Sequence, residues 1–207
     1  MMPEMKLEVA NERASSGAKA KLSFFGRFTP LIAVVALCWI VFVFNNGIND
    51  GRLNRYGIVP RNIASLPGIL FAPFLHGSLN HLMANTVPLV VLGAILCARS
   101  KGEFKVVTCC GILFGGGLTW LFARHAAHVG ASGLVFCYFG YLSSLAYFKR
   151  NFATLCLSVV CIVGYGGIIR GVLPTSAAVS WEGHLAGLLT GIATAWFWTR
   201  LENTPTS

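Results

Sequence analysis

Four side chains in this sequence are of the types that perform acyl-transfer chemistry. Ser132 lies in a Gly-Ala-Ser-Gly segment, and His184, His81 and Asn85 lie near the starts of other apolar runs. An imidazole beside a serine can take the hydroxyl proton and so produce a strong nucleophile. Histidine and asparagine side chains can donate hydrogen bonds to the oxyanion that this nucleophile creates. Together these residue types indicate serine-dependent hydrolysis.

Each of these segments also has a purely structural interpretation. A Gly-x-Ser-Gly segment at the start of a helix is commonly a turn with a capping serine. His81 and Asn85, four residues apart on one helix face, could bond each other or a neighbouring backbone, and His184 could be an interfacial histidine. The catalytic interpretation is favoured because the topology predicted below places all of them in one leaflet of one small chain.

Ser132 and His184 lie in different apolar runs, so two helices must approach closely to bring them together. Glycines remove the side chains that would hold such helices apart. They are Gly133 and Gly140 after Ser132, and Gly183, Gly187 and Gly191 around and after His184.

The composition predicts the environment of these helices. Of the 207 residues 55% are hydrophobic and 11% are charged, whereas soluble domains have about 25% charged residues. This excludes a disordered chain and leaves too few charges to cover a soluble globule. The net charge is +9, but Lys and Arg stand singly or in short groups, so nucleic acid is not an expected partner. We therefore predict an all-α membrane protein.

Six runs without Asp, Glu, Lys or Arg are long enough to span a bilayer as helices, which takes roughly 17–25 residues. They are 28–44, 82–98, 106–123, 129–148, 151–169 and 183–199. The uncharged stretch 62–80 carries two prolines and His76, so we predict an interfacial or re-entrant element there. The predicted organisation is a basic polar tail (1–27), a six-span domain (28–200) and a short C-terminal tail (201–207).

The distribution of Lys and Arg predicts the orientation of the chain. Eleven of them flank one side of the predicted spans and five flank the other, which places both termini in the cytoplasm. The second, fourth and sixth spans then begin at the external face. The segments that contain His81, Ser132 and His184 open these three spans, so all of them are expected in the external leaflet.

These segments resemble the rhomboid family of intramembrane serine proteases. The likeness covers about residues 28–200 and rests on His81-x-x-x-Asn85, Gly130-x-Ser132-Gly133 and His184-x-x-Gly187-x-x-x-Gly191, with Gly140-Tyr141 and His76 also similar. The resemblance implies a bundle of six transmembrane helices. It also implies that Ser132 is the nucleophile, that His184 is the general base, and that His81, Asn85 and the backbone N–H of Ser132 form the oxyanion hole.

The sequence departs from the family at two points. Phe136 stands where the family usually has a tyrosine stacked on the catalytic imidazole, and a phenyl ring can still stack. The Trp-Arg pair often found in the first loop is missing, because residues 47–80 contain no tryptophan.

Most soluble serine proteases add an acid that orients the histidine. The only aspartate is Asp50, in the first loop, and Glu182 is two residues from His184, which directs it to another side of a helix. A Ser–His dyad is therefore the expected arrangement, with the contribution of Glu182 left open. No metal or organic cofactor is expected, since the chain lacks a His-Glu-x-x-His segment and the pair His125 and His128 has no carboxylate beside it.

The expected function is intramembrane serine endopeptidase activity on the transmembrane segments of single-span substrates, near the external leaflet. The alternative is a catalytically inactive rhomboid-like protein that binds membrane clients. The compact form resembles bacterial members of the family, which predicts a multi-pass protein of the inner membrane. The lipid bilayer and single-span proteins are the expected partners, while the sequence leaves the identity of the substrate, its entry gate and the oligomeric state open.

Overall fold

The computed structural model describes residue 24, residues 26–175 and residues 179–203, and these parts are helical apart from loops and one isolated β-bridge. Most of the predicted tail 1–27 and the last four residues lie outside the described part. The principal α-helices are α2 (Thr29–Gly47), α4 (Leu79–Arg99), α5 (Lys101–Cys110), α6 (Gly116–Phe122), α7 (Ser132–Lys149), α8 (Phe152–Tyr165) and α9 (Trp181–Glu202).

Shorter elements connect these helices. They are the 3-10 helices η1 (Arg52–Tyr56), η2 (Ile63–Ser65), η3 (Ala72–Phe74) and η5 (Gly166–Val172), the short α3 (Gly68–Phe71) and the π-helix η4 (Gly111–Gly115). Each of the six apolar runs overlaps a principal helix, and the run 106–123 holds the end of α5 together with η4 and α6. The stretch 62–80 contains η2, α3 and η3 and no long helix before residue 79, in agreement with the prediction from its prolines.

Four helical stretches are long and apolar enough to cross a membrane. These are α2, α4, the continuous stretch α5–η4–α6 (Lys101–Phe122) and the continuous stretch α8–η5 (Phe152–Val172). Helices α7 and α9 are not among them. α7 is the inner helix of the bundle, while α9 has exposed apolar residues on one side and the buried threonines Thr190, Thr194 and Thr199 on the other.

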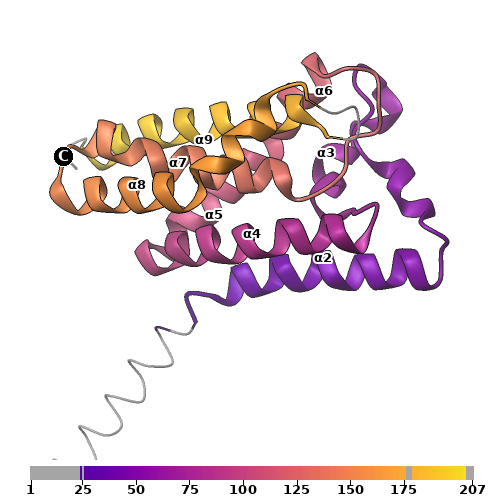
Figure 1. Cartoon of the computed structure of the whole chain (residues 1–207), viewed down its shortest axis with the longest axis horizontal. Helices are drawn as coiled ribbons and strands as arrows, with labels where there is room; N and C mark the ends of the chain where they lie inside the picture. The colour runs from indigo at the N-terminus through magenta and orange to yellow at the C-terminus, as the bar shows by residue number, and fades with distance from the viewer. Residues whose placement is uncertain (1–23, 25, 176–178, 204–207) are drawn as a thin grey trace, which may run out of the picture.

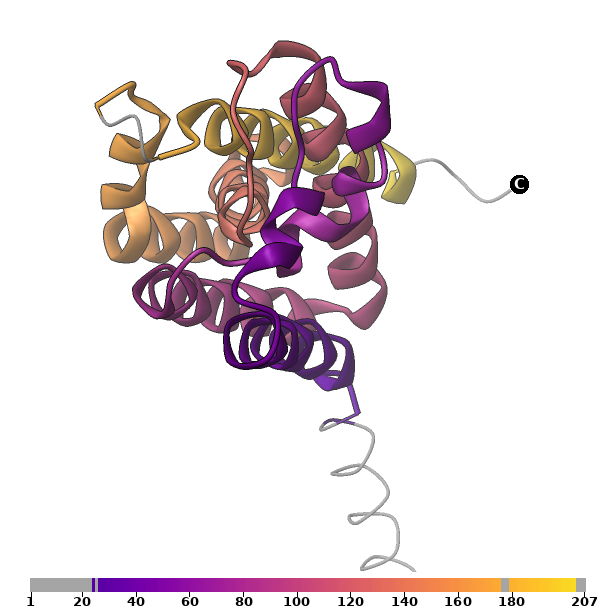
Figure 2. The same ribbon diagram turned by 90° about the vertical axis from the view of Figure 1, so that its right-hand side faces the viewer.

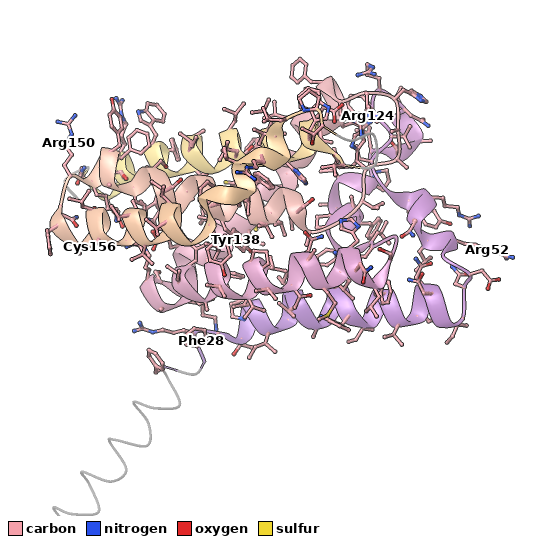
Figure 3. All side chains as sticks on the ribbon, viewed as in Figure 1. Phe28, Arg52, Arg124, Tyr138, Arg150 and Cys156 are labelled. Carbon is pink, nitrogen blue, oxygen red and sulfur yellow. The ribbon has the colours of Figure 1, made fainter. Side chains whose placement is uncertain are left out.

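The principal helices lie side by side, and most loops that bear on the site gather at the end of the bundle near α3 and α6 (Figure 1). Viewed from that end, α7 lies near the centre (Figure 2). It packs against α9, α8, α4 and α5, and ten of its residues are buried. Tyr138, labelled in the interior in Figure 3, is fully buried and its hydroxyl lies 2.7 Å from that of Thr108.

The middle of α7 is held by a buried carboxylate. The side chain of Glu103 is 4% exposed and receives hydrogen bonds from Arg99, with Nε 3.1 Å from its Oε2, and from the hydroxyl of Tyr141. A buried charge is tolerated only when it is paired and hydrogen-bonded. The cluster joins α4, α5 and α7, so the helix that begins with Ser132 is anchored near its middle, at Tyr141.

Candidate active site

The backbone around Ser132 is fixed by the loops beside it. Gly130 has φ +115°, a conformation that favours glycine, and its N–H donates to the carbonyl of Ala72 at 2.8 Å. The N–H of Ala131 donates to Nε2 of His76 at 3.3 Å. Ser132 follows as the first residue of α7 and is half-buried. Its own N–H therefore lies at a helix N-terminus, where backbone donors have no partner within the helix.

His76, which precedes α4, acts here as an acceptor. Its ring is 1% exposed, and burial lowers its pKa to about 4. The neutral ring has one N–H, which fits Nδ1 donating to the carbonyl of Phe74 at 3.4 Å while Nε2 accepts from Ala131. The ring also meets the ring of His81 edge to face, with centroids 5.2 Å apart.

His81 and Asn85 lie on one face of α4, against the backbone that leads into Ser132. Ser78 caps α4 by accepting from the N–H of His81 at 3.1 Å. A Cβ added to Gly130 would lie 2.7 Å from Nε2 of His81 and 3.3 Å from Nδ2 of Asn85. Nδ2 of Asn85 is one of two buried side-chain polar atoms in the described residues that have no hydrogen-bond partner. This donor is therefore available beside the turn that precedes the serine.

His184 is held from two sides. Its ring stacks on that of Phe136, with centroids 4.3 Å apart and an angle of 9° between the planes. Its Nδ1 lies 2.8 Å from the carbonyl oxygen of Gly171, in η5. Because a carbonyl only accepts, Nδ1 carries the proton, and in the neutral ring Nε2 is then an unprotonated acceptor. Phe136 is one helical turn after Ser132, so this stack joins α7 to α9 beside the serine.

The glycines predicted to bring α7 and α9 together lie at their contact. A Cβ added to Gly187 would collide with the carbonyl of Gly133, and one added to Gly191 would collide with that of Cys137. A Cβ on Gly140 would likewise overlap the carbonyl of Leu188. The two backbones can approach this closely only because these side chains are absent.

A small cavity of about 50 Å³ adjoins Ser132. Its lining includes Gly130, Gly133, Thr119, His128 and Ser180. In the part of the chain that the structure describes, no group of three His, Cys, Asp or Glu side chains is placed to hold a metal ion.

Several contacts at the site were not predicted from the sequence. The contact of His184 with the Gly171 carbonyl could not be predicted, because every residue has a backbone carbonyl and the sequence does not distinguish this one. The partner of Glu182 is Arg124, with Nη1 2.9 Å and 3.1 Å from the two carboxylate oxygens, so this carboxylate is directed to the loop before α7. His128 lies 2.5 Å from the hydroxyl of Ser180. The pairing of His128 was not visible because Ser180 is 52 residues away.

Comparisons with known proteins identify the family. The sequence matches the Rhomboid domain over residues 64–201, which is more than half of the chain. The uncharacterized protein Rv1337 of Mycobacterium tuberculosis is 34% identical over 177 residues, covering 81% of this chain and 73% of that protein. The uncharacterized protein ML1171 of Mycobacterium leprae is 33% identical over 175 residues, covering 80% and 69%. The chain belongs to the rhomboid family, and the resemblance predicted from its motifs is confirmed.

Proposed function

We propose that this rhomboid-family chain is an intramembrane serine endopeptidase. The observation that carries the proposal is the setting of His184, whose ring is stacked on Phe136 and bonded through Nδ1 to the Gly171 carbonyl at 2.8 Å. This leaves Nε2 as the acceptor on a histidine whose helix touches the helix of Ser132 through Gly133 and Gly187. An oriented, unprotonated imidazole beside a serine is what a general base requires.

In this proposal six helices cross the membrane. The four candidate spans are supplemented by α7 and α9, whose 18 and 22 residues reach about 27 and 33 Å at about 1.5 Å per residue. Both lengths match a hydrocarbon core of about 30 Å. With both termini in the cytoplasm, as the charge bias indicates, the site opens to the external leaflet. We place the protein in the inner membrane of a bacterium.

The chemistry follows from the donors and acceptors at the site. Nε2 of His184 takes the hydroxyl proton of Ser132 as its oxygen attacks the substrate carbonyl. The oxyanion receives hydrogen bonds from the Ser132 N–H, the Asn85 amide and the ring of His81. His184 then gives its proton to the leaving amine, and water hydrolyses the acyl-enzyme with His184 again acting as base. No metal or cofactor takes part in this scheme.

The substrate in this proposal is a single-span membrane protein that is cut near the external end of its span. A helix hides its carbonyls in internal hydrogen bonds, so the cleaved segment must become extended before a carbonyl can reach Ser132. Small or helix-destabilising residues favour that change. The position of Ser132 at the loop-rich end of the bundle supports cleavage near the surface, where water is accessible (Figure 1).

The proposal is tested with wild type and the Ser132→Ala variant, both purified in detergent. Each is treated with a fluorophosphonate probe and, separately, with a single-span reporter protein. Wild type is expected to label and to cleave, and the variant to do neither, while His184→Ala also loses both signals. Wild type that neither labels nor cleaves, in detergent and again in lipid vesicles, refutes the proposal and favours the binding of membrane clients without cleavage.

A further inference from the structure

The first turn of α9 does not use its capping residue in the usual way. Ser180 is the N-cap, where serine commonly accepts a hydrogen bond from a first-turn N–H, but its side chain makes no such bond. Its hydroxyl lies 2.5 Å from Nδ1 of His128 instead. A residue that does not make its preferred local hydrogen bond, and instead contacts a residue far away in sequence, is typical of functional sites.

Glu182 is also directed away from its own helix. A carboxylate in the first turn ordinarily stabilises the helix N-terminus. Here both carboxylate oxygens accept from Nη1 of Arg124, at 2.9 Å and 3.1 Å, and one also accepts from the Arg124 backbone N–H at 3.3 Å. Nη2 of Arg124 donates to the carbonyl of Val179 at 2.7 Å. Arg124 lies in the loop between α6 and α7, at the end of the bundle shown in Figure 3.

His128 completes the connection from the same loop. Its Nε2 lies 3.0 Å from the carbonyl oxygen of Arg124, so Nε2 carries the proton and Nδ1 accepts from the hydroxyl of Ser180. The backbone of His128 is itself fixed, because it exchanges hydrogen bonds of 2.8 Å and 3.0 Å with Ile58. The hydroxyl of Ser180 is therefore held by a rigid partner.

These contacts are partly shielded from solvent. His128 is 5% exposed, and the side chains of Glu182 and Arg124 are 10% and 35% exposed. Exposed ion pairs contribute little because solvent screens them. A largely buried network with its groups satisfied is held more rigidly.

The contacts join the two segments that carry the proposed dyad. His128 is four residues before Ser132, and Ser180 is four residues before His184. The backbone carbonyl of Ser180 accepts from the N–H of His184 at 3.1 Å. We propose that these contacts, here called the α9 latch, position His184 relative to Ser132; the inference rests on the proposed function. The latch consists of Arg124, His128, Ser180 and Glu182.

The test removes the central bond of the latch without removing a helix cap. Ser180→Ala, His128→Ala and the double variant are titrated with a fluorophosphonate to count competent sites, and kcat and KM are then measured per titrated site. We expect kcat to fall about 5- to 30-fold in Ser180→Ala, the range for a lost hydrogen bond that shifts a catalytic group, with KM nearly unchanged. The double variant should lose no more kcat than the more impaired of the two single variants, because both substitutions remove the same bond.

Two further variants separate positioning from folding. Ser180→Thr keeps the hydroxyl and is expected to restore most of kcat. Ser144→Ala removes a half-buried hydroxyl that bonds only carbonyls of its own helix, at 2.7 Å and 3.2 Å, and is expected to leave kcat unchanged.

The outcomes distinguish the latch from the proposed function. If Ser180→Ala lowers the thermal stability or the number of titratable sites but keeps the wild-type kcat per site, the latch is only structural and the inference is overturned. Additive losses in the double variant overturn it as well. Wild type without labelling or cleavage refutes the proposed function itself, and this inference with it.

Discussion

A methyl group added at position 171 should impair the proposed base without substituting His184 itself. The carbonyl of Gly171 accepts from Nδ1 of His184 at 2.8 Å. In Gly171→Ala the new Cβ would lie 2.9 Å from this Nδ1 and 2.9 Å from Cζ of Phe136. Carbon atoms in contact prefer separations of about 3.5–4.0 Å. The imidazole or η5 must therefore move by roughly 0.6–1 Å, since the phenyl ring on the other side blocks a simple rotation.

The expected size of the effect follows from this displacement. Moving η5 lengthens a bond of 2.8 Å beyond the useful range for N–H···O, which ends near about 3.2 Å. The proton on His184 is then free to occupy either ring nitrogen, and molecules with the proton on Nε2 cannot accept from Ser132. A misplacement of about 1 Å at a catalytic group costs about 10²-fold in rate. We expect kcat to fall by about 10- to 100-fold, with KM changed much less.

The matched control is Gly167→Ala, four residues earlier in η5, where an added Cβ would meet nothing within 4 Å. Both variants carry the same glycine-to-alanine change in one 3-10 helix. Turnover per fluorophosphonate-titrated site is measured for each, and ¹⁵N NMR of histidine-labelled protein reports the tautomer of His184. Equal turnover in the two variants, with the Nδ1–H tautomer kept in Gly171→Ala, would refute the orienting role of this carbonyl.

Three further substitutions test other parts of the site, each by turnover per titrated site. Asn85→Ala removes a proposed oxyanion donor and should lower kcat by about 10²–10³-fold with little change in KM. A rise in KM with kcat unchanged would contradict this role. Phe136→Leu loses the stack on His184 and should lower kcat by about 2- to 10-fold, whereas Phe136→Tyr should retain most of the wild-type kcat. Equal kcat in the two variants would show that stacking on His184 does not matter for turnover. Gly187→Ala should lower the rate about 10²-fold because it separates the helices, while Gly117→Ala, which meets nothing within 4 Å, should not.

The helices were predictable because their signal is strong and local. Long uncharged runs predicted α2, α4, α7, α8 and α9, and the two prolines of 62–80 predicted its short elements. The third run, 106–123, did not predict that α5 begins at Lys101, within a charged segment. The packing glycines of α7 and α9 were predictable from their spacing, since small residues four apart line one helix face. The family followed from a few motifs and is confirmed by the match over residues 64–201. The catalytic roles of Ser132 and His184 remain predictions for the experiments above.

Contacts made by the backbone, or by residues far apart in sequence, were not predictable. The partner of His184 is a carbonyl, and no residue type reveals where a carbonyl points. No role for His128 could be predicted from the sequence, because its partner Ser180 is 52 residues away. The π-helix η4 lies in an apolar run with no local sign of a wider turn. The spacing correctly directed Glu182 away from His184, but only the fold shows that Arg124 receives it.

The membrane setting explains why a carbonyl occupies the place of an acid beside His184. A carboxylate in a site of low dielectric loses its hydration, and it is tolerated only with a full set of partners. A backbone carbonyl orients the imidazole as an acceptor without bringing a charge into the bilayer. The nearby carboxylate of Glu182 instead lies at the loop-rich end of the bundle, where Arg124 is still 35% exposed and neutralises it. In the proposed mechanism two tasks that an acid performs in soluble proteases are separate: Gly171 sets the tautomer, and the α9 latch fixes the position of the helix.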